Sequence, residues 1–181
     1  MKRKLTKEQW LDKALEIINR EGFGTLKIDR LVRVMGVTKG SFYWHFESKK
    51  DFIANLIEYW DKKFTNNVII RIKDIADNPS ECLLELMLFI TDNQLAQYDF
   101  AIHALAQNEP DAFPLIKKVL EKRFEFVATL FSAMGFKGDE VNLRSRATVM
   151  FMTQEQNSLL KDPVDKQRKR IRLAQTLFTR P

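Results

Sequence analysis

The sequence is poor in the residues that build disulfides and membrane spans. It has a single cysteine, Cys82, in 181 residues, so no disulfide can form within the chain. Beside its leucine neighbours, Cys82 is expected to be a small core residue in a reducing cytoplasm. The longest apolar stretch, residues 83–90, is interrupted by Glu85 and falls far short of the ~18 residues that a membrane span needs. A basic start followed by polar residues is not typical of a signal peptide, and we expect a soluble cytoplasmic protein with no membrane segment.

Residues that carry catalysis or bind metals are equally scarce. There are two histidines, His45 and His103, in different segments, and no Cys/His spacing typical of zinc sites. A phosphate-binding glycine loop is missing, and Gly22-Phe-Gly24 lacks the third glycine and the preceding strand of a dinucleotide site. We therefore expect no catalytic residue, no metal site and no cofactor, and a protein that is not an enzyme.

Charge is unevenly distributed along the chain, whose net charge is +6. Residues 1–50 hold 12 Lys and Arg against 6 Asp and Glu, whereas residues 51–160 hold 11 against 16. The last 21 residues are basic again, with 7 against 2. A compact basic head on a slightly acidic body suggests nucleic-acid binding by the head, although charge alone also fits a solvated surface.

Hydrophobic spacing predicts an all-α fold of about nine helices. We expect a helix-turn-helix head over residues 1–50 and a larger helical body over residues 51–181. The predicted helices are residues 6–21, 28–35, 38–45, 48–77, 81–96, 98–107, 112–134, 139–160 and the segment after Pro163.

Local capping signals fix several of these boundaries. Thr6 and Gln9 form a capping box at the first helix. The second helix begins either at Thr25, the better cap, or after Lys27, and Gly36 ends it. Ser48 caps the fourth helix. A glycine turn between two short helices at residues 36–38 is typical of a helix-turn-helix.

The third predicted helix has an anchoring face and a polar face. Phe42 and Phe46, one turn apart, are expected to hold it on the first two helices. The other face presents Lys39, Ser41, Tyr43, Trp44 and His45. Lys can reach guanine edges or phosphate, and hydroxyls can donate to phosphate. The alternative is that Tyr43 or Trp44 packs on a neighbouring helix.

Two lysines, Lys49 and Lys50, occupy the first turn of the fourth predicted helix. Positive charge there opposes the helix dipole. A nearby phosphate backbone would account for these lysines.

The run Gly36-Val-Thr-Lys-Gly-Ser-Phe-Tyr-Trp-His-Phe-Glu-Ser-Lys-Lys-Asp-Phe52 resembles the signature of the tetracycline-repressor (TetR) family of bacterial transcription regulators. The resemblance covers roughly residues 6–60. It implies a DNA-binding head, an all-helical ligand-binding and dimerising body, and repression relieved by a small molecule. The positions that the resemblance implies face DNA are Thr38, Lys39, Gly40, Ser41, Tyr43, Trp44, His45 and Lys49. Where the family usually has Thr or Ser capping the second helix, this chain has Lys27, which could still reach phosphate.

The body is rich in Phe and Met, which suit an adaptable apolar pocket between helices. An ordinary helical core is the alternative at each position. Our candidate effector contacts are Trp60, Met87, His103, Phe124 and Met150.

The last two predicted helices carry apolar surface that indicates a two-fold homodimer. The residues concerned are Val149, Met150, Phe151, Met152, Ile171, Ala174, Leu177 and Phe178. The nearby cluster of Lys166, Arg168, Lys169, Arg170 and Arg172 is either the rim of that dimer or a second nucleic-acid patch.

The sequence thus predicts a repressor with three partners: double-stranded DNA with a near-palindromic operator, a second copy of the chain, and a small-molecule effector. A ligand-independent DNA-binding or protein-interaction module is the alternative.

Overall fold

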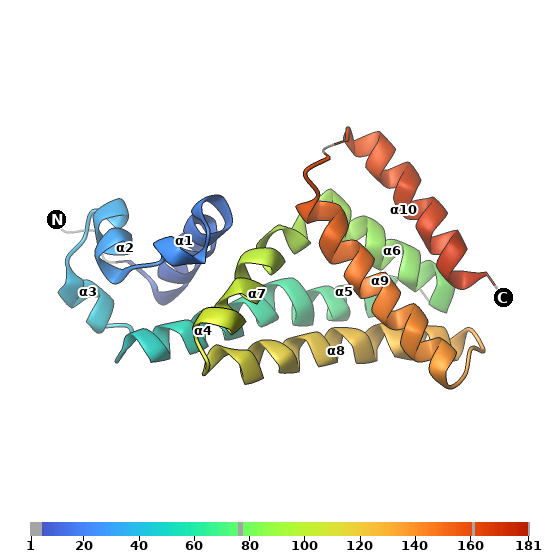
Figure 1. Ribbon diagram of the computed structural model, residues 1–181, viewed down its shortest axis with the longest axis horizontal. Helices are drawn as coiled ribbons and strands as arrows, with labels where there is room; N and C mark the ends of the chain where they lie inside the picture. The colour runs from blue at the N-terminus through green and yellow to red at the C-terminus, as the bar shows by residue number, and fades with distance from the viewer. Residues whose placement is uncertain (1–4, 76–77, 161, 181) are drawn as a thin grey trace. The chain divides into compact units, whose positions relative to one another are not determined.

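The computed structural model describes residues 5–75, 78–160 and 162–180. These residues form α-helices joined by short turns, with no β-strand among them (Figure 1). The predicted all-α fold is confirmed. The α-helices are α1 (Lys7–Glu21), α2 (Ile28–Met35), α3 (Lys39–Tyr43), α4 (Lys49–Asp61), α5 (Asn67–Ile75), α6 (Pro79–Asp92), α7 (Asp99–Asn108), α8 (Ala112–Ala133), α9 (Asp139–Asn157) and α10 (Val164–Thr179).

Ten α-helices appear where about nine are predicted, because the fourth predicted helix is interrupted. A single π-helical turn, Lys62–Asn66, separates α4 from α5. The chain stays helical from Lys49 to Ile75. The fourth predicted helix therefore corresponds to α4 and α5 together. No described helix has both the length and the apolar character needed to cross a membrane.

The helices group into two compact units that do not follow the order of the chain. Unit 1 comprises Met1–Lys62 and Tyr98–Lys117, and unit 2 comprises Lys63–Gln97 and Lys118–Pro181. α7 therefore belongs to the same unit as α1, which it contacts. The sequence offers no local sign of this long-range grouping. The functional boundary at residue 50 stays a prediction.

Unit 1 begins with the capping box that the sequence predicts. Thr6 Oγ1 accepts a hydrogen bond from the Gln9 amide at 3.2 Å, and the Gln9 side chain accepts one from the Thr6 amide at 2.9 Å. Of the two predicted starts of α2, the structure shows the one after Lys27. The N-cap is Lys27, without a side-chain cap bond, while the Thr25 hydroxyl donates to the Gly22 carbonyl at 2.7 Å.

An aromatic cluster forms part of the core of unit 1. Phe42 of α3 is fully buried, and its ring centroid lies 5.6 Å from that of Trp10 and 5.2 Å from that of Phe52. Phe46 is also buried and lies 5.0 Å from Phe42. These rings join α1, α3 and α4, so α3 is held by the two phenylalanines that the sequence predicts as its anchors.

Unit 2 has its own apolar core, in which α6 contacts α5, α9 and α10. Cys82 is buried in this core. The buried members of this core are Val68, Ile72, Cys82, Leu83, Leu86, Met87, Leu88, Phe126, Val127, Leu130, Phe131, Met152 and Ile171.

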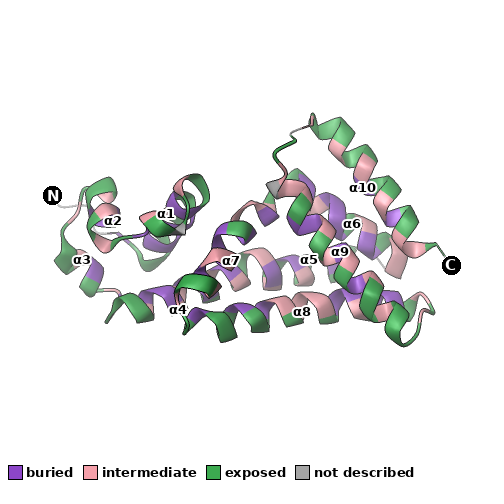
Figure 2. Ribbon diagram, viewed as in Figure 1, coloured by how far each residue is buried: buried purple, intermediate pink, exposed green. Residues whose placement is uncertain are grey.

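The predicted apolar stripe of α10 divides between two faces (Figure 2). Ile171 is fully buried, and Phe178 packs edge-on against Phe151 at 5.7 Å. Leu177, by contrast, is exposed, as is Leu173 one turn earlier. On α9, Met152 is buried and Met150 is exposed. Of the eight apolar residues named for the dimer surface, Met150 and Leu177 are exposed, whereas the other six belong to or pack against the core of unit 2.

Candidate nucleic-acid interface

The turn before α3 is built from Gly36 and Thr38. Gly36 has φ +67° and ends α2, and the Val37 amide donates to the Val32 carbonyl at 3.0 Å. A left-handed residue suits glycine because it has no Cβ to clash with the backbone. Thr38 then caps α3 by accepting a hydrogen bond from the Ser41 amide at 3.4 Å. The two helices are thus joined by a short turn, as in a helix-turn-helix.

α3 presents two large aromatic side chains to solvent. Tyr43 is 53% exposed and Trp44, which follows the helix, is 68% exposed. The neighbouring Phe42, by contrast, is completely buried in the core. This exposure argues against the alternative that Tyr43 or Trp44 packs on a neighbouring helix.

Lys39, the first residue of α3, forms an ion pair with α2. Its Nζ lies 2.6 Å from Asp29 Oδ1, and both side chains are exposed. The hydrogen bond to Asp29 raises the pKa of the Lys39 ammonium group above its usual range, and the charge of Asp29 acts in the same direction. Lys39 therefore carries a positive charge at the exposed start of α3.

His45 is tied to the start of the chain. Its Nε2 lies 2.8 Å from the carbonyl oxygen of Leu5, forty residues earlier, and the ring is half-buried. This contact gives His45 a structural role that the sequence does not reveal. A contact between His45 and phosphate stays a prediction.

The remaining predicted DNA-facing residues of this segment are accessible. Lys27, Thr38 and Gly40 are exposed, and Ser41 is half-buried. A hydroxyl that accepts a cap bond, as in Thr38, can still donate its own proton to a phosphate. A Cβ added at Gly40 would meet only Thr38 Oγ1, at 3.7 Å, so the fold itself does not require glycine here.

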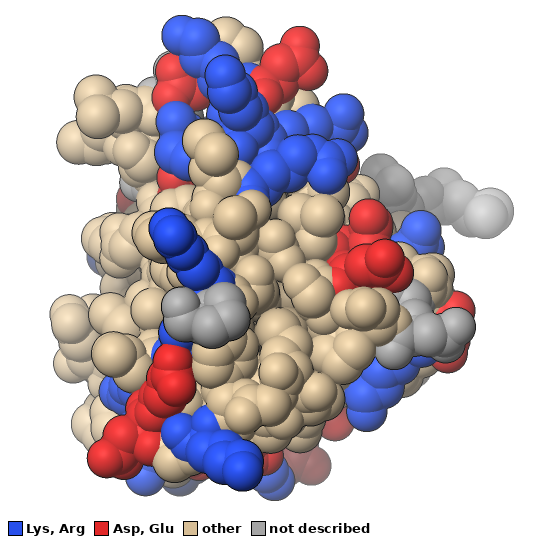
Figure 3. All heavy atoms as spheres, turned by 90° about the vertical axis from the view of Figure 1, so that its right-hand side faces the viewer, with Lys and Arg blue, Asp and Glu red and all other residues tan. Residues whose placement is uncertain are grey.

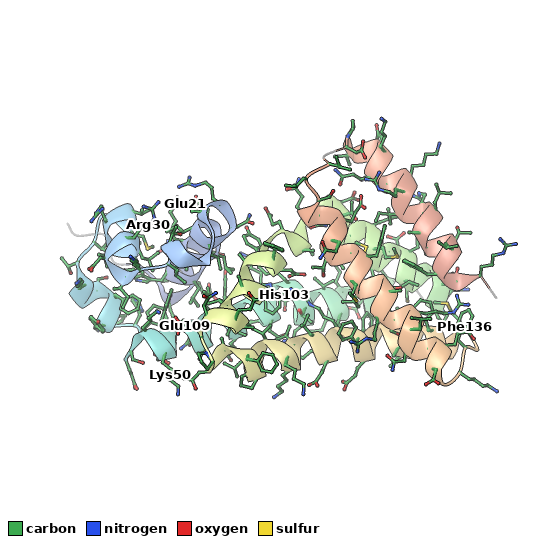
Figure 4. The ribbon with its side chains drawn as sticks, viewed as in Figure 1. Glu21, Arg30, Lys50, His103, Glu109 and Phe136 are labelled. Atoms are coloured by element: carbon green, nitrogen blue, oxygen red, sulfur yellow. The ribbon has the colours of Figure 1, made fainter. Side chains whose placement is uncertain are left out.

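The lysines at the start of α4 form ion pairs with carboxylates that are distant in sequence but belong to the same unit (Figure 4). Ser48 caps α4 by accepting from the Asp51 amide at 3.0 Å. Lys49 forms an ion pair with Glu109, and Lys50 Nζ lies 3.0 Å from Asp111 Oδ2. Both acids lie at the turn between α7 and α8. Lys49, which is predicted to bind phosphate, therefore already has an anionic partner, Glu109, within the chain.

Sequence reasoning did not predict the acidic partners of Lys39, Lys49 and Lys50. Asp29, Glu109 and Asp111 are not part of any motif. Glu109 is 60 residues from Lys49, so only the folded structure brings the two together.

A family model matches the region that contains this site. The model describes bacterial regulatory proteins of the tetR family and matches residues 11–56, which include α2, α3 and the start of α4. Residues 11–56 thus form a region of the tetR family, whose members are DNA-binding transcription regulators and not enzymes.

The curated relatives, at low identity, are HTH-type transcriptional regulators. The chain is 23% identical over 135 residues to the HTH-type transcriptional regulator YuxN of Bacillus subtilis, covering 71% of this chain and 46% of YuxN. It is 22% identical over 92 residues to the HTH-type transcriptional regulator AcrR of Shigella flexneri, covering 51% of this chain and 43% of AcrR. The chain thus spans less than half the length of each of these relatives.

Solved structures show that the fold extends over nearly the whole chain. A transcriptional regulator from Rhodococcus sp. Rha1 aligns with a TM-score of 0.77 at 14% identity, covering 97% of this chain and 94% of that one. AibR, in complex with isovaleryl coenzyme A and operator DNA, aligns with a TM-score of 0.76 at 16% identity, covering 96% and 98%. At such identities the likeness concerns the tetR-type fold alone.

The candidate effector contacts are divided between the two units. Trp60 and His103 belong to unit 1, where Trp60 is fully buried and His103 is half-buried on α7 (Figure 4). Met87 is buried in unit 2, whereas Met150 is 58% exposed there. Phe124, half-buried in the same unit, lies under the Arg146 guanidinium at 5.2 Å. Each remains a prediction.

The basic cluster of α10 is largely engaged within unit 2. Arg168 donates two hydrogen bonds to Asp92, at 2.7 and 2.8 Å. Arg170 pairs with Glu155 and with Asp162. Both interpretations of this cluster, the rim of a dimer and a second nucleic-acid patch, stay predictions. Among the described residues, no group of three or more His, Cys, Asp or Glu side chains is placed to hold a metal ion.

Proposed function

We propose that this chain is a ligand-responsive repressor that binds a near-palindromic DNA operator as a homodimer and is released by a small molecule. The observation that carries the DNA-binding part is the division of α3 into two faces. Phe42 is completely buried on one face, whereas Lys39 and Tyr43 are exposed on the other. A short helix held firmly by one face can offer the other to the major groove, where its first residues meet base edges.

The proposed roles follow from the chemistry of the exposed groups. Lys39 and Ser41 lie nearest the bases, since Lys donates to guanine O6 and N7 and a hydroxyl can serve either base edge. Tyr43, His45 and Lys49 contact phosphates, which positions the head without reading sequence. Gly40 leaves room for the backbone to approach DNA closely.

Exposed apolar side chains on α9 and α10 support the dimer. Leu143 and Met150 are exposed on α9, and Leu173 and Leu177 on α10. The face drawn in Figure 3 has a broad uncharged area, with charged side chains mainly toward its edges. Two antiparallel copies of such a helix pair would form a four-helix bundle. A two-fold dimer would place its two recognition helices ~34 Å apart, or a multiple of that distance, on successive major grooves.

The effector part is supported by a structural neighbour and by the composition of unit 2. AibR binds isovaleryl coenzyme A and operator DNA, so this fold can serve both ligands. Trp60, Met87, His103 and Phe124 are our candidate contacts, while the exposure of Met150 also fits the dimer surface. A cytoplasmic location follows from the proposed role.

Two lysine variants test the DNA-binding proposal. Lys49→Ala should weaken binding to all duplexes and reduce the slope of log affinity against log salt by about one unit, because one phosphate contact is lost. Lys39→Ala should weaken the operator more than a random duplex. Lys137→Ala, at an exposed lysine of unit 2, is the matched control. Unchanged affinity and slope in Lys49→Ala would remove Lys49 from the interface.

A ligand-independent DNA-binding module is the competing function. A thermal-shift screen with small apolar and cationic compounds separates the two, since a ligand that binds the folded state raises the unfolding temperature by mass action. A stabilising compound that also releases operator DNA supports the repressor. A stabilising compound without effect on DNA binding supports the alternative.

A further inference from the structure

Two carboxylates at one turn of unit 1 hold the two lysines that begin α4. We define the acidic corner as Glu109 and Asp111, which flank Pro110 between α7 and α8. Glu109 pairs with Lys49 and Asp111 pairs with Lys50. Figure 4 shows Glu109 and Lys50 at neighbouring positions, one at this turn and the other at the start of α4.

The backbone of the acidic corner is fixed on both sides. The Glu109 amide donates to the Leu105 carbonyl at 2.8 Å, and the Glu109 carbonyl accepts from the Ala112 amide at 2.9 Å. The Glu109 side chain is only 27% exposed, compared with 69% for Asp111. Glu109 is therefore the better positioned of the two acids, and its ion pair with Lys49 is the less screened by solvent.

The acidic corner also supplies negative charge near the start of α4, where two lysines are electrostatically unfavourable. Lys49 and Lys50 lie in the first turn, where the partial positive charge of the helix disfavours cations. Negative charge from Glu109 and Asp111 offsets that cost in the free protein. DNA phosphates would supply the same compensation in a complex, and they would use the same two ammonium groups.

We propose that the acidic corner competes with DNA phosphates for Lys49 and Lys50, so that Glu109 and Asp111 restrain the electrostatic part of DNA binding. This inference rests on the proposed phosphate contact of Lys49. Each lysine must exchange a carboxylate for a phosphate, or hold both anions at once, when DNA binds. Either event reduces the favourable free energy of the lysine–phosphate contact. In the first, an existing ion pair is lost, and in the second, the carboxylate repels the phosphate.

The test measures binding of a fluorescent random-sequence duplex over a range of salt concentrations. Glu109→Gln should tighten binding at low salt by about 1.5- to 5-fold, the range that corresponds to an exposed or half-exposed ion pair. The salt slope should steepen by a fraction of one unit, because Lys49 already contributes part of its counterion release in the wild type. Asp111→Asn should have a smaller effect, since its ion pair is more exposed.

Glu125→Gln is the matched control for net charge. Glu125 is an exposed residue of α8, and its replacement changes the overall charge by the same amount. The same replacement of Glu109 in a Lys49→Gln background should have no more effect than this control. Such a double-mutant cycle isolates the pair. Thermal unfolding of each variant confirms that it is folded.

Three results would overturn the proposal. Equal effects of Glu109→Gln and Glu125→Gln would mean that Glu109 acts only through net charge. Weaker binding by Glu109→Gln would mean that Glu109 positions Lys49 for phosphate instead of competing with it. Equal affinity and salt slope in wild type and Lys49→Gln would remove the proposed phosphate contact itself. The last result is recognisable without any Glu109 variant, so it separates failure of the function from failure of the corner.

Discussion

Lys39 Nζ lies 2.6 Å from Asp29 Oδ1, so the first residue of α3 is held by a carboxylate in the first turn of α2. The pair joins the two helices of the helix-turn-helix at the face proposed for DNA. Because Asp29 raises the pKa of Lys39, Lys39 stays charged throughout the neutral range.

Asp29→Asn should increase binding to random-sequence DNA by about 1.5- to 5-fold, because one exposed ion pair and one phosphate-repelling charge are lost. The ratio of operator to random affinity should fall, since Lys39 is no longer restrained. Fluorescence anisotropy with both duplexes measures this, and Glu125→Gln again controls for charge. Weaker binding to both duplexes would instead show that Asp29 orients Lys39 for contact.

Glycine substitutions should separate folding from DNA binding. Gly36→Ala should lower the free energy of unfolding by about 1–2 kcal/mol, because φ of +67° is unfavourable for a residue with a Cβ. Gly40→Ala should keep or slightly raise stability, since it is helical and has room for a methyl group. Chemical denaturation measures both.

Gly40→Ala should nevertheless weaken operator binding if the backbone approaches DNA at this position. Operator affinity equal to that of wild type would place Gly40 outside the interface.

The dimer depends on the outward side chains of α9 and α10. Met150→Lys and Leu177→Glu should shift the protein to monomers at micromolar concentration, because each places a charge in a buried contact. Analytical ultracentrifugation measures the shift. Leu159→Glu, at a fully exposed residue between these helices, is the control. Sedimentation of Met150→Lys and Leu177→Glu identical to wild type would rule out this surface.

Met152 is not a suitable site for this test. It is 5% exposed and belongs to the core of unit 2, so a charge there would disturb folding before it reported on association.

The ion pair of Asp92 and Arg168 should make stability depend on pH in acid. The hydrogen bonds from Arg168 lower the pKa of Asp92, against the opposing effect of burial. A carboxyl whose pKa is lowered by folding stabilises the protein above its unfolded pKa of about 3.9. That contribution is lost as the pH falls through the folded pKa.

Asp92→Asn should therefore reduce the free energy of unfolding by about 0.5–1 kcal/mol at neutral pH. The difference from wild type should shrink toward zero as the pH falls through the lowered pKa of folded Asp92. Urea denaturation at a series of pH values measures it. Asp74→Asn, at an exposed aspartate of α5, should show no such trend. A difference that persists in acid would mean that Asp92 acts through packing.

An effector found by screening should bind more weakly in the presence of operator. If it weakens operator affinity 100-fold, operator must weaken effector affinity by the same factor, which corresponds to a coupling free energy of ~2.7 kcal/mol. Calorimetric titration with and without operator measures both affinities. Equal effector affinity in the two titrations would show that the ligand is not coupled to the DNA-binding head.

The sequence by itself determined the local features of this protein. The Thr6 capping box, the turn at Gly36 and the two faces of α3 all depend on residues within about four positions of one another. Helix periodicity and capping act over that range. For this reason the elements and most residues of the proposed DNA-facing surface could be predicted without a structure.

Only the tertiary structure decided which distant residues meet. It buried Ile171 and exposed Leu177, although both belong to one predicted stripe, because α10 packs on α6. It also brought Glu109 to Lys49 across 60 residues of chain. Such a contact depends on how helices pack and how the intervening chain closes, and neither leaves a local pattern in the sequence.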